Sequence, residues 1–494
     1  MKLSKYQKVI YKVFQKTKKD INISAVAGSG KTTVLLGLLR FIPVNASSLF
    51  LAFNNSIVDE LKDRNERKDV EIMTIHSCGW RLILQRYGGK VKMNPNKGIA
   101  KTEKVLREFE IPEKRRGYFF YVIPKILDLM RCNLSNNTVE DITELINHYD
   151  IDIDEDDIKM VIRAFELLVK DKSQFDFMDM IYVPVVDASI RFRKFEFVFC
   201  DESQDFSLAQ HEFIKNCLSR KGRLVTVGDK RQAIYGFAGA DAESYDKLAT
   251  INGQAIKLPL SVSYRCDINI VKEAQKIVPE ISYAPGASEG VVRNGSLTDI
   301  QQGDWILCRN LKPLVQAYLW LMKNKIKSKI RGKEIGEGIL SLIVKTGAKT
   351  ISGLEKMLDL ERNKLMRKLE SKGVRKPSLH PKMEVLQQKI EVINCLSEEV
   401  QSVDELKKLI KGIFSDEVKG IILSTIHKAK GLENDRIFFL APELIPSKYA
   451  TQPWQYEQEQ NLFYVAVTRA KHELIYVWGN VFLEDIKGKV ILSK

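Results

Sequence analysis

The sequence predicts an α/β protein with two parallel-sheet domains, each interrupted by a mainly helical insertion. Its 494 residues are too many for one ordinary hydrophobic core. Short apolar, β-branched runs followed by helical sequence recur along the chain, and this alternation is typical of parallel sheets covered on both faces. Two long, nearly all-helical stretches break the alternation, one in each half of the chain.

The expected strands fall into two groups. Four runs in the first half are interpreted as buried strands, at residues 21–27, 48–53, 195–200 and 223–227. Four more follow at 305–308, 421–425, 436–440 and 474–477. Helical patterns such as 157–170, 354–369 and 381–396 lie between them. We therefore expect a first sheet domain at 1–84 and 186–262 with an insertion at 85–185, and a second at 263–330 and 416–494 with an insertion at 331–415.

The charge balance favours a polyanionic partner. Lys and Arg number 78 against 63 Asp and Glu, which gives a net charge of +15 and an isoelectric point near 9.2. Each phosphate that a basic protein neutralises releases condensed counterions, so such an excess is common in nucleic-acid-binding proteins. A well-solvated basic surface without a partner would give the same balance. The charge alone leaves both interpretations open.

The cysteines and the apolar runs indicate the compartment. Seven cysteines are widely scattered and none forms a C-x-x-C pair, so neither a zinc site nor a disulfide framework is indicated. That usage fits a reducing cytoplasm. The first residues are polar, unlike a signal peptide, and no apolar stretch is long enough to span a membrane. We expect a soluble, cytoplasmic protein with no membrane partner.

The clearest local motif is A-V-A-G-S-G-K-T at 25–32, between an expected strand and an expected helix. That context is what a P-loop requires, although the strict pattern has Gly where Ala25 stands. Its glycines let backbone N–H groups approach phosphate oxygens at a helix N-terminus. Lys31 should reach the β- and γ-phosphates, and the Thr32 hydroxyl should coordinate Mg²⁺. The expected phosphate-binding residues are Gly28, Ser29, Gly30, Lys31, Thr32 and Thr33.

A carboxylate pair ends the buried run at 195–200 and supplies the second element that a P-loop needs. Asp201 is placed to bind Mg²⁺, and Glu202 to act as the base or to position water. A surface acidic pair is the alternative, but carboxylates directly after four apolar residues are uncommon in that role. The two motifs together predict hydrolysis of ATP with Mg²⁺.

Six motifs then resemble the UvrD/Rep/PcrA family of superfamily 1 DNA helicases, in that family's order and over almost the whole chain. They are L-S-K-Y-Q at 3–7, D-E-S-Q-D at 201–205, V-G-D-K-R-Q-A-I-Y-G-F at 227–237, S-Y-R-C at 263–266, T-I-H-K-A-K-G-L-E at 425–433 and Y-V-A-V-T-R-A-K at 464–471. The resemblance implies two RecA-like domains, with helical insertions 1B and 2B and ATP in the cleft between the domains. It also implies DNA-dependent ATP hydrolysis and movement on single-stranded DNA, in the 3′→5′ direction.

The resemblance also implies roles for single residues. Gln7 would read the adenine, Gln232 would sense the γ-phosphate, and Tyr264 would stack on the base. Arg265 and Arg469 would act as arginine fingers, and Glu433 would meet the nucleotide. Catalysis of phosphoryl transfer needs such positive groups from outside the P-loop. Residues implied to line the DNA path are Phe53, Asn54, Thr74, His76, Tyr235, Phe237, Thr425 and His427.

Several positions depart from the family pattern. Lys230 and Arg231 stand where acidic residues are usual, Ala238 stands where an Arg is usual, and Gln460 and Asn461 replace a paired Arg. These changes touch the coupling between nucleotide and strand rather than the hydrolytic core. The second insertion is also shorter than the family's usual one.

Other functions remain open. The chain could be an ATPase subunit that senses DNA ends and loads or regulates a partner nuclease. Compact members of the family in anti-phage defence, such as the helicase subunit of the Gabija system, are similar in size and layout. A phage replication or recombination helicase fits the same residues. The intact motifs argue against a nucleic-acid-binding protein that has lost its ATPase activity. The residues of the motif at 425–433 argue against a 5′→3′ motor.

Overall fold

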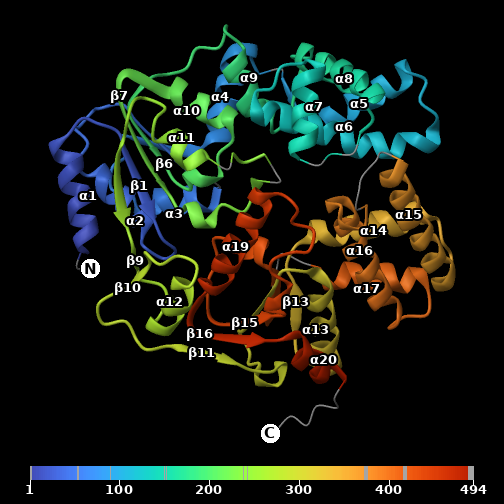
Figure 1. Cartoon of the computed structure of the whole chain (residues 1–494). Helices are drawn as coiled ribbons and strands as arrows, with labels where there is room; N and C mark the ends of the chain where they lie inside the picture. Colours follow the sequence, from blue (N-terminus) through green and yellow to red (C-terminus); the bar gives the residue numbers. More distant parts are fainter. Residues whose placement is uncertain are drawn as a thin grey trace. The chain divides into compact units, whose positions relative to one another are not determined.

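The computed structural model describes residues 3–52, 55–89, 91–149, 151, 153–236, 239–241, 243–371, 377–414 and 420–487. The chain divides into two compact units, Met1–Ser261 and Val262–Lys494, which are described here one at a time. Figure 1 shows the elements of both units, with labels where there is room.

Unit 1 is built on a six-stranded parallel sheet in the order β3-β2-β6-β7-β1-β8. Its strands are β1 (Ile21–Ala25), β2 (Ser48–Ala52), β3 (Val70–Thr74), β6 (Phe195–Cys200), β7 (Leu218–Gly228) and β8 (Ile256–Leu260). Helices flank it: α1 (Lys5–Lys16), α2 (Lys31–Leu39), α3 (Asn55–Arg64), α4 (Ile75–Tyr87), α10 (Leu208–Cys217) and α11 (Ser244–Leu248).

Side chains alternate between two cores across this sheet. In β2, Phe50 belongs to the core under α1 and α2, while Leu49 and Leu51 belong to the core that continues into the helical insertion. The pairing of Phe50 with Phe199 and of Leu51 with Cys200 carries the same alternation into β6. A strand buried on both faces reads as a continuous apolar run, which is why these strands were evident in the sequence.

Between β3 and β6 the chain forms the helical insertion of unit 1. Its helices are α5 (Lys97–Glu108), α6 (Glu113–Asn133), α7 (Val139–His148), α8 (Ile158–Lys170) and α9 (Asp179–Val186), with the two-residue strands β4 (Lys92–Met93) and β5 (Gln174–Phe175). Figure 1 shows them as the cyan and green helices beyond α4.

A buried ion network joins the helices of this insertion. Lys97 lies 2.7 Å from Asp179, and Arg131 lies 2.6 Å from Asp176 and 3.0 Å from Asp179. The Arg131 side chain has no exposed surface, and those of Lys97 and Asp179 are almost completely buried. Buried charges are tolerated only when they are paired, so the network fixes α5, α6 and α9 to one another.

Unit 2 repeats the architecture with a second six-stranded parallel sheet, in the order β11-β16-β15-β12-β14-β13. Its strands are β11 (Val291–Asn294), β12 (Trp305–Cys308), β13 (Ser328–Ile330), β14 (Ile421–Thr425), β15 (Asn434–Leu440) and β16 (Ala470–Val477), and β9 (Val262–Ser263) pairs with β10 (Ser282–Tyr283). The helices of this part are α12 (Ile268–Gln275), α13 (Leu311–Lys323), α18 (Ile426–Ala429), α19 (Pro453–Val467) and α20 (Gly479–Lys487).

Between β13 and β14 lies the second helical stretch. It contains α14 (Lys333–Thr346), α15 (Ile351–Ser371), α16 (Pro381–Ser397) and α17 (Val403–Ile413). Their apolar faces join the sheet's own core in one cluster, which includes Ile339, Leu358, Ile393 and Ile410 together with Ile306 and Leu423. No described helix combines the length and apolar character needed to cross a bilayer.

The expected α/β class with two parallel sheets is confirmed. Strand boundaries differ in places: β1 ends at Ala25 rather than at residue 27, and β7 begins at Leu218 rather than at 223. Two strands of the six-stranded sheet of unit 1, β3 and β8, and two of that of unit 2, β11 and β13, were not predicted. β8 contains Pro259, which lacks an N–H donor, and the strand tolerates it because β8 is at the edge of the sheet.

Candidate active site

The turn between β1 and α2 has the backbone of a phosphate-binding loop. Gly28 and Gly30 have φ angles of 69° and 80°, which β-carbon-bearing residues rarely adopt. Gly30 caps α2 without a side chain, and its carbonyl accepts from Val34 N at 2.9 Å. The Ser29 hydroxyl is buried and has no hydrogen-bond partner among the described residues. Phosphate oxygens accept hydrogen bonds, and the buried Ser29 hydroxyl and the N–H groups at the start of α2 can donate them, so the loop fits a nucleotide.

Lys31 and Thr32, the first residues of α2, face the carboxylates that follow β6. Lys31 Nζ lies 3.1 Å from Glu202 Oε1, and Thr32 Oγ1 donates to Asp201 Oδ2 at 3.3 Å. Burial lowers the pKa of Lys31, but the charges of Glu202, Asp229 and Asp201 outweigh it and raise that pKa above its usual value. Burial, with the Glu202 charge close by, raises the pKa of Asp201 to about 7. A hydroxyl and a carboxylate so close together are oxygen ligands of the kind Mg²⁺ takes.

A second layer of hydrogen bonds orients these carboxylates. Gln204 Nε2 donates to Glu202 Oε2 at 2.6 Å, and Gln204 Oε1 accepts from Asp229 N at 2.9 Å. Asp229 in turn accepts from Gln232 Nε2 at 2.6 Å. The chain Glu202–Gln204–Asp229–Gln232 therefore connects the ends of β6 and β7. Gln204 and Asp229 were not among the predicted site residues, although the Q of D-E-S-Q-D and the D of G-D-K-R-Q signalled them.

Gln7 and Thr33 border this loop. Gln7 is buried in α1 and forms a capping box with Ser4, in which Gln7 Oε1 accepts from Ser4 N at 2.9 Å. Its Nε2 lies 3.7 Å from the position a β-carbon at Gly30 would take. Thr33 Oγ1 accepts from Arg64 Nη2 at 3.0 Å. Unit 1 thus brings the predicted phosphate loop, both carboxylates, Gln232 and Gln7 together.

The predicted strand-path residues of unit 1 lie at the ends of β3 and β7. Thr74 caps α4 through a bond from Ser77 N at 3.1 Å, which positions His76 in the first turn. His76 is half-buried, and burial lowers its pKa. Tyr235 is half-buried after the 3₁₀ turn at Lys230–Gln232. Phe53, Asn54 and Phe237 lie outside the described residues.

In unit 2 the two predicted arginines meet at Thr468. Arg265 Nη1 donates to the Thr468 carbonyl at 3.2 Å, and Arg469 Nη2 donates to the Thr468 hydroxyl at 3.3 Å. Arg469 is 1% exposed and also donates to the carbonyls of Val465 and Leu432. Arg469 is therefore held in the interior of unit 2 by main-chain carbonyls.

Glu433 and Tyr264 lie next to Arg265. Glu433 Oε2 lies 2.5 Å from Arg265 Nε, and its Oε1 lies 3.4 Å from Lys471 Nζ. Burial raises the pKa of Glu433, but these two cations outweigh it and leave the pKa below its usual value. Tyr264 is 36% exposed.

Thr425 and His427 lie at the start of α18, next to a buried ion cluster that sequence reasoning did not anticipate. Arg309 Nη2 lies 2.9 Å from Glu459 and 3.2 Å from Glu384. Burial, together with the positive charges of Arg309 and Lys430, lowers the pKa of His427 to about 3. His427 is therefore neutral at ordinary pH, and a neutral imidazole can both donate and accept.

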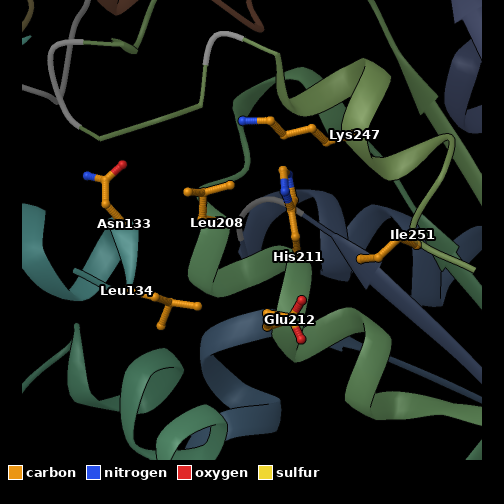
Figure 2. A pocket seen from close by; sticks show the side chains of 7 residues that line it. All are labelled: Asn133, Leu134, Leu208, His211, Glu212, Lys247 and Ile251. Atoms are coloured by element: carbon orange, nitrogen blue, oxygen red, sulfur yellow. The ribbon is translucent and has the colours of Figure 1, made fainter. Parts of the chain in front are cut away.

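A separate open pocket of about 320 Å³ lies between the insertion and the sheet domain of unit 1 (Figure 2). His211 faces it from α10, and its Nε2 lies 2.7 Å from Ser244 Oγ, which donates to the Ser203 carbonyl at 2.7 Å. The lining residues are Asn133, Leu134, Leu208, His211, Glu212, Lys247 and Ile251. The pocket contains none of the predicted site residues.

Comparisons with known proteins agree with the motifs. Residues 7–250 match the model of the UvrD/REP helicase N-terminal domain, and residues 420–477 match that of the UvrD-like helicase C-terminal domain. The ATP-dependent DNA helicase PcrA of Bacillus subtilis is 26% identical over 281 residues, which cover 52% of this chain and 37% of PcrA. PcrA of Staphylococcus epidermidis is 26% identical over 293 residues, 53% of this chain and 38% of that protein.

A probable DNA helicase of Mycoplasma pneumoniae is 24% identical over 480 residues, 91% of this chain and 79% of its own length. The PcrA alignments, by contrast, span little more than a third of PcrA.

Proposed function

The chain belongs to the UvrD/Rep helicase family, and from this premise we propose that it is a DNA-dependent ATPase that moves on single-stranded DNA in the cytoplasm, in the 3′→5′ direction. The observation that carries the proposal is the cluster of Lys31, Thr32, Asp201 and Glu202 around the phosphate loop. These residue types at these distances are what phosphoryl transfer needs for binding, metal coordination and water activation.

We assign the hydrolytic roles as follows. Lys31 binds the β- and γ-phosphates, and Thr32 and Asp201 hold Mg²⁺, which neutralises phosphate charge when bound. Glu202 takes the proton of the attacking water, and Gln204 keeps its carboxylate oriented through the 2.6 Å bond. Gln232 contacts the γ-phosphate and is connected to the end of β7 through its hydrogen bond to Asp229. Gln7, Tyr264 and Glu433 contact the nucleoside side, and Arg265 and Arg469 supply positive charge to the transition state.

The path of the single-stranded DNA is proposed from residues that lie at the ends of β-strands. We propose that Thr74, His76, Thr425 and His427 contact the DNA backbone, and that Phe53, Asn54, Tyr235 and Phe237 contact bases. Aromatic faces and small polar groups along a basic protein are the elements of single-strand binding. We further propose that 85–185 and 331–415 act as insertions 1B and 2B of two RecA-like domains at 1–84 with 186–262 and at 263–330 with 416–494.

The test is ATP hydrolysis with and without single-stranded DNA, in the wild type and in Lys31→Ala. The expected result is strong stimulation by DNA that Lys31→Ala abolishes. Lys62→Ala, an exposed lysine on α3, is the matched control and should hydrolyse ATP as the wild type does. Hydrolysis that is indifferent to DNA would contradict an autonomous motor. Release of labelled streptavidin from the 3′ or 5′ end of an oligonucleotide then tests the direction.

A second proposal keeps the ATPase but makes the chain a subunit that senses DNA ends and loads or regulates a partner nuclease, as in anti-phage defence. It is favoured by the basic residues next to Gln232, because this departure from the family pattern affects the coupling between nucleotide and DNA strand rather than ATP hydrolysis. Lys230 lies 3.1 Å from Asp246 and turns the usual acidic position of the family into a cation bound to α11. ATP hydrolysis that appears only with a nuclease partner and free DNA ends would support this second role over the first.

A further inference from the structure

The excess positive charge of the chain is concentrated at its beginning. The first 19 residues contain seven lysines and no Asp or Glu, against a net charge of +15 for all 494 residues. Lys5, Lys8, Lys12 and Lys16 lie on α1, and Lys18 and Lys19 follow in the turn. All six are exposed. In the described part of the chain, none of the six forms an ion pair, whereas Asp20 is buried and accepts from Leu224 N.

The four lysines of α1 form one face, which we call the lysine face. They recur at intervals of three and four residues, so they project within about 80° of one another and extend over about 16 Å of helix. The opposite side of α1 is buried, with Gln7, Ile10 and Phe14 against the sheet. The sheet therefore fixes the direction in which the lysine face points.

This arrangement is unfavourable for the helix itself. Lys8–Lys12 and Lys12–Lys16 are like-charge pairs at i,i+4, each of which destabilises a helix by about 0.2–0.5 kcal/mol. Lys5 and Lys8 also lie in or beside the first turn, where the helix dipole disfavours cations, and α1 has no acidic residue there. The capping box and the buried face hold the helix together in spite of this. An anionic partner is what would make such a face favourable.

The face fits the backbone of duplex DNA better than other anionic partners. A membrane surface requires a continuous apolar face beside the lysines, but Ile10 and Phe14 are packed into the core, which leaves Val9 as the exposed aliphatic residue of α1. Single-stranded DNA requires aromatic platforms, but the Tyr11 ring packs against Phe41 at 5.5 Å between centroids. A row of cations with no base-reading group suits a regular, highly charged phosphate backbone.

The lysine face is separate from the proposed strand path. α1 packs against β8, the edge strand at one side of the sheet, whereas Thr74 and His76 follow β3, the edge strand at the other side. The same helix touches the nucleotide loop through Gln7 on its inner side. Figure 1 shows α1 in blue along the side of unit 1.

We propose that the lysine face of α1 is a second, sequence-independent docking surface for the phosphate backbone of duplex DNA, an inference that rests on the proposed function. The duplex contacted there is the double-stranded part of the DNA on which the motor acts. The surface holds the duplex beside unit 1 while the strand path takes the single strand.

The test is the salt dependence of binding to a blunt, fluorescently labelled duplex in the absence of nucleotide. The variant Lys8→Gln/Lys12→Gln/Lys16→Gln keeps Lys5 and the capping box. Its plot of log K against log salt should be shallower than that of the wild type by about 2.7, which is three phosphates at about 0.9 each. Between about 50 and about 200 mM salt, the wild type should therefore lose about 40-fold more affinity than the variant.

The matched control is Lys407→Gln/Lys408→Gln/Lys411→Gln, three lysines of α17, a helix that also carries Asp404 and Glu405. An unchanged slope in the α1 variant, or an equal change in both variants, would overturn the proposal. Binding of poly-glutamate is measured as well. If the α1 variant loses poly-glutamate binding but keeps duplex binding, the proposal is also overturned, because the lysine face would then bind an acidic polypeptide. ATPase stimulation of the wild type by single-stranded DNA is measured in parallel. If that stimulation is absent, the proposed function fails, and if only the slope is unchanged, this inference fails.

Discussion

Arg309 donates hydrogen bonds to both carboxylate oxygens of Glu459, at 3.0 Å and 3.1 Å from Nε and at 2.9 Å from Nη2. Nη2 also lies 3.2 Å from Glu384. Arg309 follows β12, Glu384 lies on α16 and Glu459 lies on α19, so one guanidinium joins the sheet, the helical stretch and the helix that precedes Arg469. Ser447 completes the cluster, because its N donates to Glu459 and its hydroxyl to Glu384.

Arg309→Ala should destabilise unit 2 strongly. It leaves the buried Glu459 and the half-buried Glu384 without their cation, and breaking a buried ion pair in this way costs about 3–5 kcal/mol. Hydrogen exchange of the α16 and α19 amides should quicken while that of unit 1 does not. The control is Arg40→Ala, which breaks the exposed ion pair between Arg40 and Glu66. It should change the free energy of unfolding by less than about 1 kcal/mol. Equal effects of the two substitutions would show that the cluster contributes no more than a surface pair.

Gln204→Ala should slow ATP hydrolysis without preventing ATP binding. The amide holds Glu202 on one side and the Asp229 backbone on the other, so its loss removes one of the bonds that orient the Glu202 carboxylate, while the ion pair with Lys31 remains. Removing a residue that orients a catalytic ligand costs about 10–100-fold in activity. Steady-state kinetics should show the loss in kcat, with KM for ATP little changed. Gln210→Ala, in the capping box of α10, is the control, and a loss of similar size there would assign the effect to folding.

The stability of unit 1 should fall as the pH drops below about 6.5, in part through His211. Burial lowers the pKa of His211 to about 4. The unfolded chain therefore takes up the proton first, so the stabilisation is complete above the unfolded pKa and is lost as the pH falls towards about 4. Between about pH 7.5 and about pH 5, His211 should account for a loss of about 2 kcal/mol.

Comparison with His211→Gln isolates this contribution. The variant should be less stable than the wild type at neutral pH, because it weakens the bond to Ser244, and the gap should narrow by about 2 kcal/mol at about pH 5. Urea unfolding of both proteins at the two pH values measures it. A gap that is constant with pH would mean that His211 titrates normally in the folded protein.

Gly79→Ala should disrupt the packing of α4 on α9. A β-carbon at Gly79 would lie 1.7 Å from the carbonyl oxygen of Met180, and a backbone atom cannot move aside as a flexible side chain can. We expect a loss of more than about 3 kcal/mol in the free energy of unfolding, or failure to fold. Gly117→Ala in α6, with no atom within 4 Å of its β-carbon position, should instead stabilise by about 0.5–1 kcal/mol. Thermal unfolding of the two variants separates these outcomes, and similar melting temperatures would contradict the prediction.

The sequence was informative where function depends on adjacent residues. The left-handed glycines Gly28 and Gly30 and the first residues of α2 form one local motif, and Asp201 and Glu202 follow a strand buried on both faces. Such patterns are set by backbone geometry, which the chain encodes locally. The bond between Gln204 and Asp229 joins residues 25 positions apart, and that from Arg309 to Glu459 joins residues 150 positions apart, so their pairing depends on the sheet order. Nor does the motif around Arg469 show that main-chain carbonyls enclose its guanidinium.

The charge network of Lys97, Arg131, Asp176 and Asp179 has a mechanical consequence. Asp179 opens α9, and the next residue, Met180, touches α4 at Gly79. A bend at this junction would separate buried ions in a medium of low dielectric, where each unpaired charge costs several kcal/mol. Among the described residues, these ion pairs therefore brace the base of the insertion of unit 1. The insertion therefore moves as a rigid body, and a force applied to its far end is transmitted through α9 to α4, the helix that contains His76.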